Sequence, residues 1–370
     1  MSRISRRRFL QIGAGLTFYP LLSNSATPPR ALTEISANQF LYGGLKGFVI
    51  GSERNNRDLA YFNSLVSTGA NVGRIFFHFT KCNKCVGYQL APNDVVALKH
   101  VLDIARTKGV RLIVVGDFQD SGQSSFWQNE SLRKSFVDNW REFVKVFGND
   151  PVIAGLDLLN EPNPPWPSND VVDTHETWRS LAQQAIDVIR KERITLPIIY
   201  EGVGGGQSIG LKGLVPLNDS NIVYSIHYYT PHEITHQKVN ASWIRTIPYP
   251  ASIGMGLGKW DAERGATFWN IRQMEFDLRH VIDFQLRYKL PIYVGEFSCV
   301  RWAPNGSQQR YISDCIELFR KYGWSWTYHE YRGWPGWDAE IASEDPQATR
   351  RSLNAPVIKL LRAEMSKNSK

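Results

Sequence analysis

The sequence lacks the short glycine motifs that hold nucleotide phosphates. No G-x-G-x-x-G and no P-loop follows the early strand-like segments, and the glycine-rich stretch 202–206 comes late in the chain. Such motifs are typical of doubly wound α/β sheets that bind nucleotides. Their absence makes an open sheet the weaker of two possible α/β folds, and 202–206 is better interpreted as a flexible loop after a strand.

Cysteine is scarce, with four residues in a chain of 370. Structural zinc sites usually take ligands from two closely spaced pairs, and only Cys82 and Cys85 form such a pair. Because this pair lies in a loop-like segment, it does not resemble a redox motif at the start of a helix. In an exported protein, either Cys82–Cys85 or Cys299–Cys315 could form a disulfide. We predict no metal and no cofactor.

Basic residues are in modest excess, with a formal net charge of +8. Several of them, Arg3, Arg6, Arg7 and Arg8, fall within the first ten residues, where no acidic residue lies nearby. No later block of Lys and Arg alternates with aromatic residues, as a nucleic-acid surface would require. The charge pattern therefore predicts no nucleic-acid partner.

The N-terminal arginines precede a short apolar run, residues 12–22, and small residues at 23–26. This order is typical of a secretory signal peptide, and the run is too short to span a bilayer comfortably. The sequence SRRRFL at 5–10 also resembles a twin-arginine export signal. We predict residues 1–26 as the signal and 27–370 as one mature domain, periplasmic or secreted by a bacterium and free of the membrane. The alternative is an uncleaved basic anchor or tail.

Large aromatic rings are abundant, with 12 Trp, 15 Tyr and 18 Phe. Trp140 and Trp178 fall in helical patterns and are expected in the core. Rings on loops suit a sugar-binding cleft, because an aromatic face packs against the apolar C–H face of a pyranose. The candidates for such platforms are Trp166, Trp243, Trp260, Trp302, Trp334 and Trp337.

Short apolar segments alternate with longer amphipathic ones from residue 40 onward. Strands buried on both faces are expected at 47–50, 73–79, 111–117, 153–159, 197–201, 222–228, 291–297 and 324–328. Helices with a period near 3.6 are expected at 94–108, 130–147, 176–191, 268–288 and 308–322, with a closing helix at 355–365. Strand followed by helix, repeated eight times, predicts a single-domain (β/α)₈ TIM barrel. The long insertion 230–266 is expected over its C-terminal face.

Two glutamates stand at the ends of predicted strands. Glu161 follows the fourth strand and Glu296 ends the seventh, so both would face the C-terminal mouth of the barrel. Retaining glycoside hydrolysis needs two carboxyl groups about 5–5.5 Å apart, one to protonate the leaving oxygen and one to attack the anomeric carbon. We predict Glu161 as the acid/base and Glu296 as the nucleophile.

Polar residues at other strand ends are expected to support this pair. Arg74, in the second strand, would hold Glu296 ionised through charge-assisted hydrogen bonds. Tyr229, after the sixth strand, would donate to the same carboxylate, and His227 would orient bound sugar. Asn160, beside the acid, is placed to hydrogen-bond a 2-hydroxyl of the substrate.

The chain resembles glycoside hydrolase family 5 over roughly residues 40–340. The resemblance rests on four motifs in this order: Arg74, Asn160-Glu161-Pro, His227-x-Tyr229 and Gly-Glu296-Phe. The resemblance implies a retaining β-glycosidase that needs no cofactor and acts on an oligo- or polysaccharide. We expect an endo-acting, cellulase-like monomer on β-1,4-glucan, although mannan, glucoside and glycolipid specificities occur on this template. The alternatives are an envelope-remodelling transglycosylase and a non-hydrolytic carbohydrate-binding barrel.

Two positions depart from the family pattern. Many members have a His after the third strand, two residues after an Asp, where this chain has Gln119. The eighth strand often ends in a Trp, for which Trp326 and His329 are the candidates here. We therefore add these three residues to the predicted substrate-binding set.

Other polar residues are given structural interpretations. Asp117 and Asp157 are expected to form hydrogen bonds inside the barrel rather than to act in catalysis. A metal held by His232, Glu233 and His236 is a weaker alternative, because the spacing of these residues is loose.

Overall fold

The computed structural model describes residue 32 and residues 35–51, 57–82, 86–165, 171–240, 244–254 and 267–369. The predicted export signal lies outside these ranges, as do Cys85, Trp166, Trp243 and Trp260. Within the described ranges, no helix combines the length and the apolar character needed to cross a bilayer.

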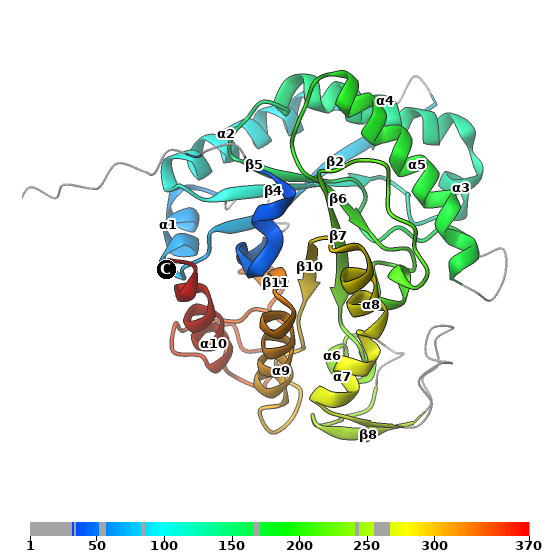
Figure 1. The fold of residues 1–370 in the computed structure, drawn as a ribbon. Coiled ribbons are helices and arrows are strands. Elements are labelled where there is room, and N and C mark those ends of the chain that lie inside the picture. Colours follow the sequence, from blue (N-terminus) through cyan, green and yellow to red (C-terminus); the bar gives the residue numbers. More distant parts are fainter. Residues whose placement is uncertain are drawn as a thin grey trace, which may run out of the picture.

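Eight parallel strands form a closed barrel (Figure 1). Around the ring they pair in the order β1, β2, β4, β5, β6, β7, β10 and β11, and β11 pairs back with β1. The predicted (β/α)₈ barrel is confirmed. The strands are β1 (Lys46–Ile50), β2 (Val72–Lys81), β4 (Arg111–Phe118), β5 (Ile153–Asp157), β6 (Ile198–Glu201), β7 (Ile222–Tyr228), β10 (Ile292–Phe297) and β11 (Ser325–Tyr331).

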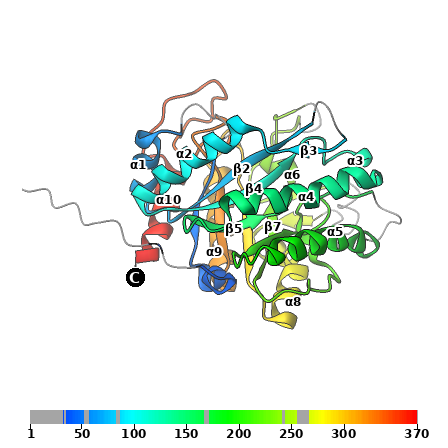
Figure 2. The same ribbon diagram turned by 90° about the horizontal axis from the view of Figure 1, so that it is seen from above.

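The longer helices lie outside the ring of strands (Figures 1 and 2). They are α1 (Leu59–Ser67), α2 (Pro92–Lys108), α4 (Glu130–Phe147), α5 (Val172–Lys191), α8 (Arg279–Tyr288), α9 (Ser307–Tyr322) and α10 (Pro356–Met365). The shorter elements include η1 (Ala37–Gly43), β3 (Tyr88–Gln89), α3 (Ser124–Gln128), α6 (His232–Thr235), β8 (Ala251–Ile253) and η5 (Ser366–Ser369).

Two tryptophans of the outer helices connect the core to the strand ends. Trp140 on α4 and Trp178 on α5 are fully buried, as predicted. The indole of Trp140 donates a hydrogen bond to the carbonyl of Leu158 at 3.1 Å, and that of Trp178 donates to the carbonyl of Glu201 at 2.9 Å. Buried indole N–H groups need such acceptors. The two helices therefore fix the backbone where β5 and β6 meet the mouth of the barrel.

Two connections differ from the prediction. The segment 268–288 was predicted as one helix, but it divides into β9 (Thr267–Trp269), α7 (Ile271–Asp277) and α8. Asn270 causes the late start, because its extended backbone ends β9 and its side chain accepts hydrogen bonds from the N–H groups of Arg272 and Gln273. Between β6 and β7, the chain forms only the short 3₁₀ helix η3 (Ser208–Leu211) instead of a full helix.

The cysteines separate into two kinds. Cys82 is disulfide-bonded, whereas its predicted partner lies outside the described residues. The alternative bridge Cys299–Cys315 is wrong, because both thiols are free and buried. Cys299 Sγ lies 3.8 Å from the carbonyl oxygen of Ile234, and burial raises the pKa of both thiols. These two side chains therefore act as small apolar core residues.

Candidate active site

The two predicted catalytic glutamates meet at the C-terminal mouth of the barrel. Glu161 follows β5 and Glu296 lies near the end of β10. One carboxylate oxygen of Glu161 lies within 4.8 Å of one of Glu296. This gap fits the roughly 5–5.5 Å typical of retaining glycosidases and is shorter than the roughly 6.5–9.5 Å of inverting ones.

Arg74 connects the carboxylates beneath this mouth. Its side chain is fully buried in β2, and Nη1 donates to Glu296 Oε1 at 2.6 Å. Nη2 donates to Glu201 Oε1 at 2.6 Å, to Asp157 Oδ2 at 2.9 Å and to Asn160 Oδ1 at 3.1 Å. A guanidinium offers five donors in a fixed plane, so one side chain can serve several acceptors. The predicted contact between Arg74 and Glu296 is present.

Glu296 is buried among cations and donors. Tyr229 Oη donates to Glu296 Oε2 at 2.8 Å, and His329 Nδ1 lies 3.1 Å from the same oxygen. Burial alone would raise the pKa of Glu296, but the positive charges of His227, His329 and Arg74 outweigh it and lower that pKa well below its ordinary value. The carboxylate is therefore held ionised, as a nucleophile requires.

Glu161 is positioned by a strained turn and by two side chains. Its φ is +48°, a left-handed conformation that non-glycine residues rarely adopt. Its N–H donates to Glu201 Oε2 at 2.9 Å, and His227 Nδ1 lies 2.9 Å from its Oε1. The side chain of Glu161 is 44% exposed, in contrast to the buried Glu296. The backbone of Glu161, the acid candidate, is therefore held in place, while its side chain is accessible to substrate.

Glu201, at the end of β6, was not predicted. It is fully buried between Arg74 and the N–H of Glu161, and its Oε1 lies 3.3 Å from His227 Nε2. The signal was available in the sequence, because Glu201 ends a predicted strand as Glu161 and Glu296 do. Its role is to anchor the turn that carries Glu161.

Asp157 makes the internal contacts that were predicted for it. Burial and the neighbouring Glu201 raise its pKa well above the ordinary value, although Arg74 opposes them. Asp157 is therefore interpreted as a buried side chain that forms hydrogen bonds and takes no direct part in the reaction.

Gln119 does not reach the predicted position in the site. β4 ends at Phe118, so Gln119 turns outward, and its exposed side chain accepts a hydrogen bond from the N–H of Lys81 at 3.1 Å. The rim carries a different pair instead. His78 Nδ1 on β2 lies 2.5 Å from Asp117 Oδ2 on β4, and both side chains are partly exposed.

Trp326 is also absent from the site. It is buried in the core, where its ring meets Phe297 edge to face at 5.5 Å. Side chains alternate along a strand, so Thr327 and His329 face the opposite side of β11 from Trp326. Trp326 and His329 were both candidates for this position in the site, and His329 is the one that occupies it.

The side chains that could hold a metal are already engaged in hydrogen bonds. In the described part of the chain, one cluster brings three candidate ligand atoms together, from Glu161, His227 and Glu296. His227 contacts Glu161, and Glu296 is paired with Arg74. The weaker alternative of His232, Glu233 and His236 forms no such cluster within the same described ranges.

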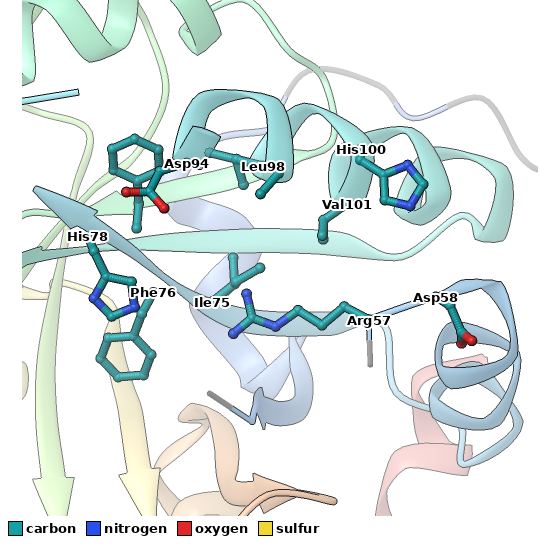
Figure 3. Close-up of a pocket in the computed structure, with 11 residues that line it drawn as sticks. Arg57, Asp58, Ile75, Phe76, His78, Asp94, Leu98, His100 and Val101 are labelled. Atoms are coloured by element: carbon teal, nitrogen blue, oxygen red, sulfur yellow. The ribbon is translucent and has the colours of Figure 1, made fainter. Parts of the chain in front are cut away.

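A cavity of about 140 Å³ lies between β2 and α2, apart from the two glutamates (Figure 3). Asp94, Leu98 and His100 line it from α2, whereas Phe76 and His78 lie on the other side of the β2 ribbon. None of the carboxylates bonded to Arg74 lines this cavity.

The amino-acid sequence is similar to those of known proteins. A family model described as cellulase (glycosyl hydrolase family 5) matches residues 34–334. Endoglucanase C of Acetivibrio thermocellus is 28% identical over 271 residues, covering 68% of this chain and 73% of the relative. Cellodextrinase A of Ruminococcus flavefaciens is 24% identical over 268 residues, covering 72% and 71% of the two chains.

Solved structures resemble the fold. Cel5A of Thermotoga maritima in complex with mannotriose matches with a TM-score of 0.66 at 20% identity, covering 88% of this chain and 98% of that one. The cellulose synthase subunit Z of Clostridioides difficile matches with a TM-score of 0.65 at 18% identity, covering 86% and 99%. At these identities, the likeness supports the barrel fold alone.

Proposed function

The chain belongs to the cellulase family, glycosyl hydrolase family 5, and we propose that it cleaves internal β-1,4 linkages of a glucan with retention of configuration. It is a glycosidase whose curated relatives include endoglucanases. The observation that carries the mechanism is the short gap between the carboxylates of Glu161 and Glu296.

In the first step, Glu161 protonates the glycosidic oxygen while Glu296 attacks the anomeric carbon, which gives a covalent glycosyl-enzyme. His227 holds Glu161 Oε1, which leaves Oε2 for the proton transfer. In the second step, Glu161 takes a proton from water, and the oxygen of that water replaces the Glu296 ester. Asn160 supports both steps, because Arg74 binds its Oδ1 and so leaves its amide N–H groups for the substrate 2-hydroxyl.

Product analysis on a panel of polysaccharides tests this proposal. On soluble β-1,4-glucan, we expect viscosity to fall before many reducing ends appear, with β-anomers as the first products by NMR. Mannan belongs in the panel because a similar fold binds mannotriose. α-Anomers would overturn retention. Products longer than the substrate would favour a transglycosylase, and binding without cleavage would favour a non-hydrolytic barrel.

His329 is expected to set the acid limb of the pH profile. Glu296 must be ionised to attack, and His329 is one of the cations that lower its pKa, together with His227 and Arg74. Removing that charge in His329→Gln should raise the pKa of Glu296. Activity would then be lost at a higher pH as the solution is acidified, with the acid limb of kcat/KM displaced upward by about one unit.

His236 provides a matched control for this measurement. It lies near Tyr229, with ring centroids 5.1 Å apart, but burial, His232 and His329 lower its pKa to about 3. Since His236 is neutral over the working range, His236→Gln should leave the acid limb in place. Equal displacement in both variants, or none in His329→Gln, would contradict the assignment of His329.

We also propose that the protein is exported, since residues 1–26 have the order of a twin-arginine signal.

A further inference from the structure

His329 lies between the nucleophile and a second carboxylate. Its Nδ1 lies 3.1 Å from Glu296 Oε2, and its Nε2 lies 3.8 Å from Oε2 of Glu330, the next residue in β11. Glu330 is buried, and the side chain of His329 is 18% exposed. The two ring nitrogens of His329 therefore face two different acids, of which only Glu296 has a part in the reaction steps described above.

The hydrogen bonds around Glu296 make Nδ1 of His329 a donor. Tyr229 has one hydroxyl proton, which its Oη donates to Glu296 Oε2 at 2.8 Å. The same Oη lies 2.6 Å from His329 Nδ1. Because the hydroxyl proton is already used, the oxygen accepts at this second contact, and Nδ1 carries a hydrogen. The charge of His329 then depends on Nε2, since an imidazolium has a proton on both nitrogens.

Glu330 is the acid that Nε2 faces. An ionised carboxylate attracts positive charge, so it favours a proton on Nε2. At 3.8 Å the two groups form an ion pair rather than a hydrogen bond. Burial alone would lower the pKa of His329, but the charges of Glu296 and Glu330 outweigh it. Arg74 opposes these two carboxylates, and the pKa of His329 is still raised.

Four further groups face His329 from the elements packed against it. They are Arg74 on β2, Tyr229 after β7, His236 after α6 and Trp337 after β11. None of the four brings a negative charge, because burial and the neighbouring carboxylates raise the pKa of the Tyr229 hydroxyl well above its ordinary value. In the described part of the chain, the carboxylates paired with His329 are thus Glu296 and Glu330.

The fold holds the Glu330 carboxylate in this position. Its Oε1 accepts a hydrogen bond from the N–H of Trp334 at 2.6 Å. Two glycines leave the space that it fills, since a Cβ on Gly333 would lie 2.2 Å from Glu330 Oε2 and one on Gly51 would lie 3.3 Å from it. A side chain at position 333 would therefore displace the carboxylate, because packed atoms do not approach so closely.

We propose that Glu330 is a positioning residue that acts through His329, which it keeps doubly protonated while Glu296 is bonded to the sugar. This inference rests on the proposed function. In the glycosyl-enzyme, Glu296 is an ester and has lost its negative charge. His329 then keeps Glu330 as its paired carboxylate. The charged imidazolium stabilises the Glu296 carboxylate that departs when water attacks, and no proton passes to or from Glu330.

The two chemical steps should depend on Glu330 differently. In the first step, Glu296 starts as an anion, so it favours the proton on His329 with or without Glu330. In the second step, the ester no longer does so, and Glu330 acts alone. Removing the charge of Glu330 should therefore slow hydrolysis of the glycosyl-enzyme and leave its formation nearly unchanged.

Glu330→Gln tests this difference on 2,4-dinitrophenyl β-cellobioside, and its amide oxygen still accepts from Trp334. The leaving group departs without a proton, so hydrolysis of the glycosyl-enzyme limits kcat. We expect the alkaline limb of kcat to lie about one unit lower than in wild type. Above that limb, kcat and KM should both fall about 5- to 10-fold, while kcat/KM changes by less than about two-fold.

Three further variants separate charge from shape. Glu330→Asp keeps the charge and should restore part of the alkaline limb. Glu340→Gln is the matched control, because Glu340 is a 1% exposed carboxylate after the same strand and is bonded to Arg332 at 2.7 Å. It should keep the wild-type limb. Gly333→Ala, whose methyl group displaces the Glu330 carboxylate, should move the limb in the same direction as Glu330→Gln and would replace that variant if it failed to fold.

NMR gives a readout that does not depend on turnover. With ¹⁵N-labelled histidine, a pH titration follows both nitrogens of His329 in the free enzyme and in enzyme trapped as a 2-fluoro-glycosyl ester. In Glu330→Gln, Nε2 should lose its proton at a lower pH than in wild type, and the displacement should be larger in the trapped form.

A uniform fall of kcat and kcat/KM at every pH would mean that Glu330 only supports the loop, and it would overturn the proposal. An unmoved limb in Glu330→Gln, or an equal displacement in Glu340→Gln, would overturn it too. An inactive wild type would instead count against the proposed function. The titration of the free enzyme would then still decide whether Glu330 holds the proton on His329.

Discussion

Glu296→Gln is expected to lower kcat/KM by about 10⁴-fold or more on every substrate that wild type cleaves. The amide keeps the shape of the side chain and an oxygen for Arg74, but it cannot attack the anomeric carbon. A single aryl β-cellobioside, followed by leaving-group release, provides the measurement. In Glu296→Gly, azide should enter the vacated space and restore activity with an α-glycosyl azide as product, which identifies the face that Glu296 attacks.

The control for this variant is Glu233→Gln. Glu233 lies in the short helix α6, in the segment once considered for metal binding, and its replacement should leave kcat/KM near that of wild type. Chelation with EDTA should likewise have no effect on turnover. If Glu296→Gln retained activity, the nucleophile would have to be another carboxylate near Arg74, and Glu201 would be the first to replace.

The barrel could be predicted because its strands have an unusual composition. Strands such as β5 and β7 are buried at every position, so they appear in the sequence as short continuous apolar runs. The positions of Glu161 and Glu296 follow from the same pattern, since a carboxylate at or just after the end of such a run lies at the mouth of the barrel.

The same double burial explains why Trp326 was misplaced. On a half-exposed strand, alternation of polar and apolar residues shows which side chains share a face. Six of the seven residues of β11 are buried, so the sequence gives no such indication. Trp326 and His329 are three positions apart and therefore face opposite sides of the strand. Only the structure shows that His329, and not Trp326, is the residue on the side of the site.

Gln119 and Glu201 illustrate two other limits of prediction from the sequence. Gln119 lies one residue past the end of β4, where the side-chain direction depends on the turn rather than on the strand. Glu201 had the same sequence signal as Glu161 and Glu296, but a double displacement needs only two carboxylates. Its role depends on long-range contacts with Arg74 and the N–H of Glu161, which no local pattern contains.

Glu161→Ala is expected to lower kcat/KM by an amount that depends on the leaving group of the substrate. On an unactivated glucan, kcat/KM should fall by about 10³-fold, because the departing oxygen is no longer protonated. On a 2,4-dinitrophenyl β-cellobioside, whose leaving group departs without a proton, kcat/KM should fall much less. Hydrolysis of the glycosyl-enzyme would then be slow, so a burst of dinitrophenol and a lowered KM should appear in stopped-flow measurements.

Azide distinguishes this variant from Glu296→Gly. In Glu161→Ala, azide should attack the glycosyl-enzyme from the face opposite Glu296 and give a β-glycosyl azide. Glu201→Gln tests the effect of the position of Glu161 alone. It weakens the hydrogen bond that anchors the N–H of Glu161 but leaves the carboxyl group of Glu161 present. Its loss should be smaller and nearly the same for both leaving groups. A uniform loss in Glu161→Ala would mean that Glu161 supports the turn and that another group carries the proton.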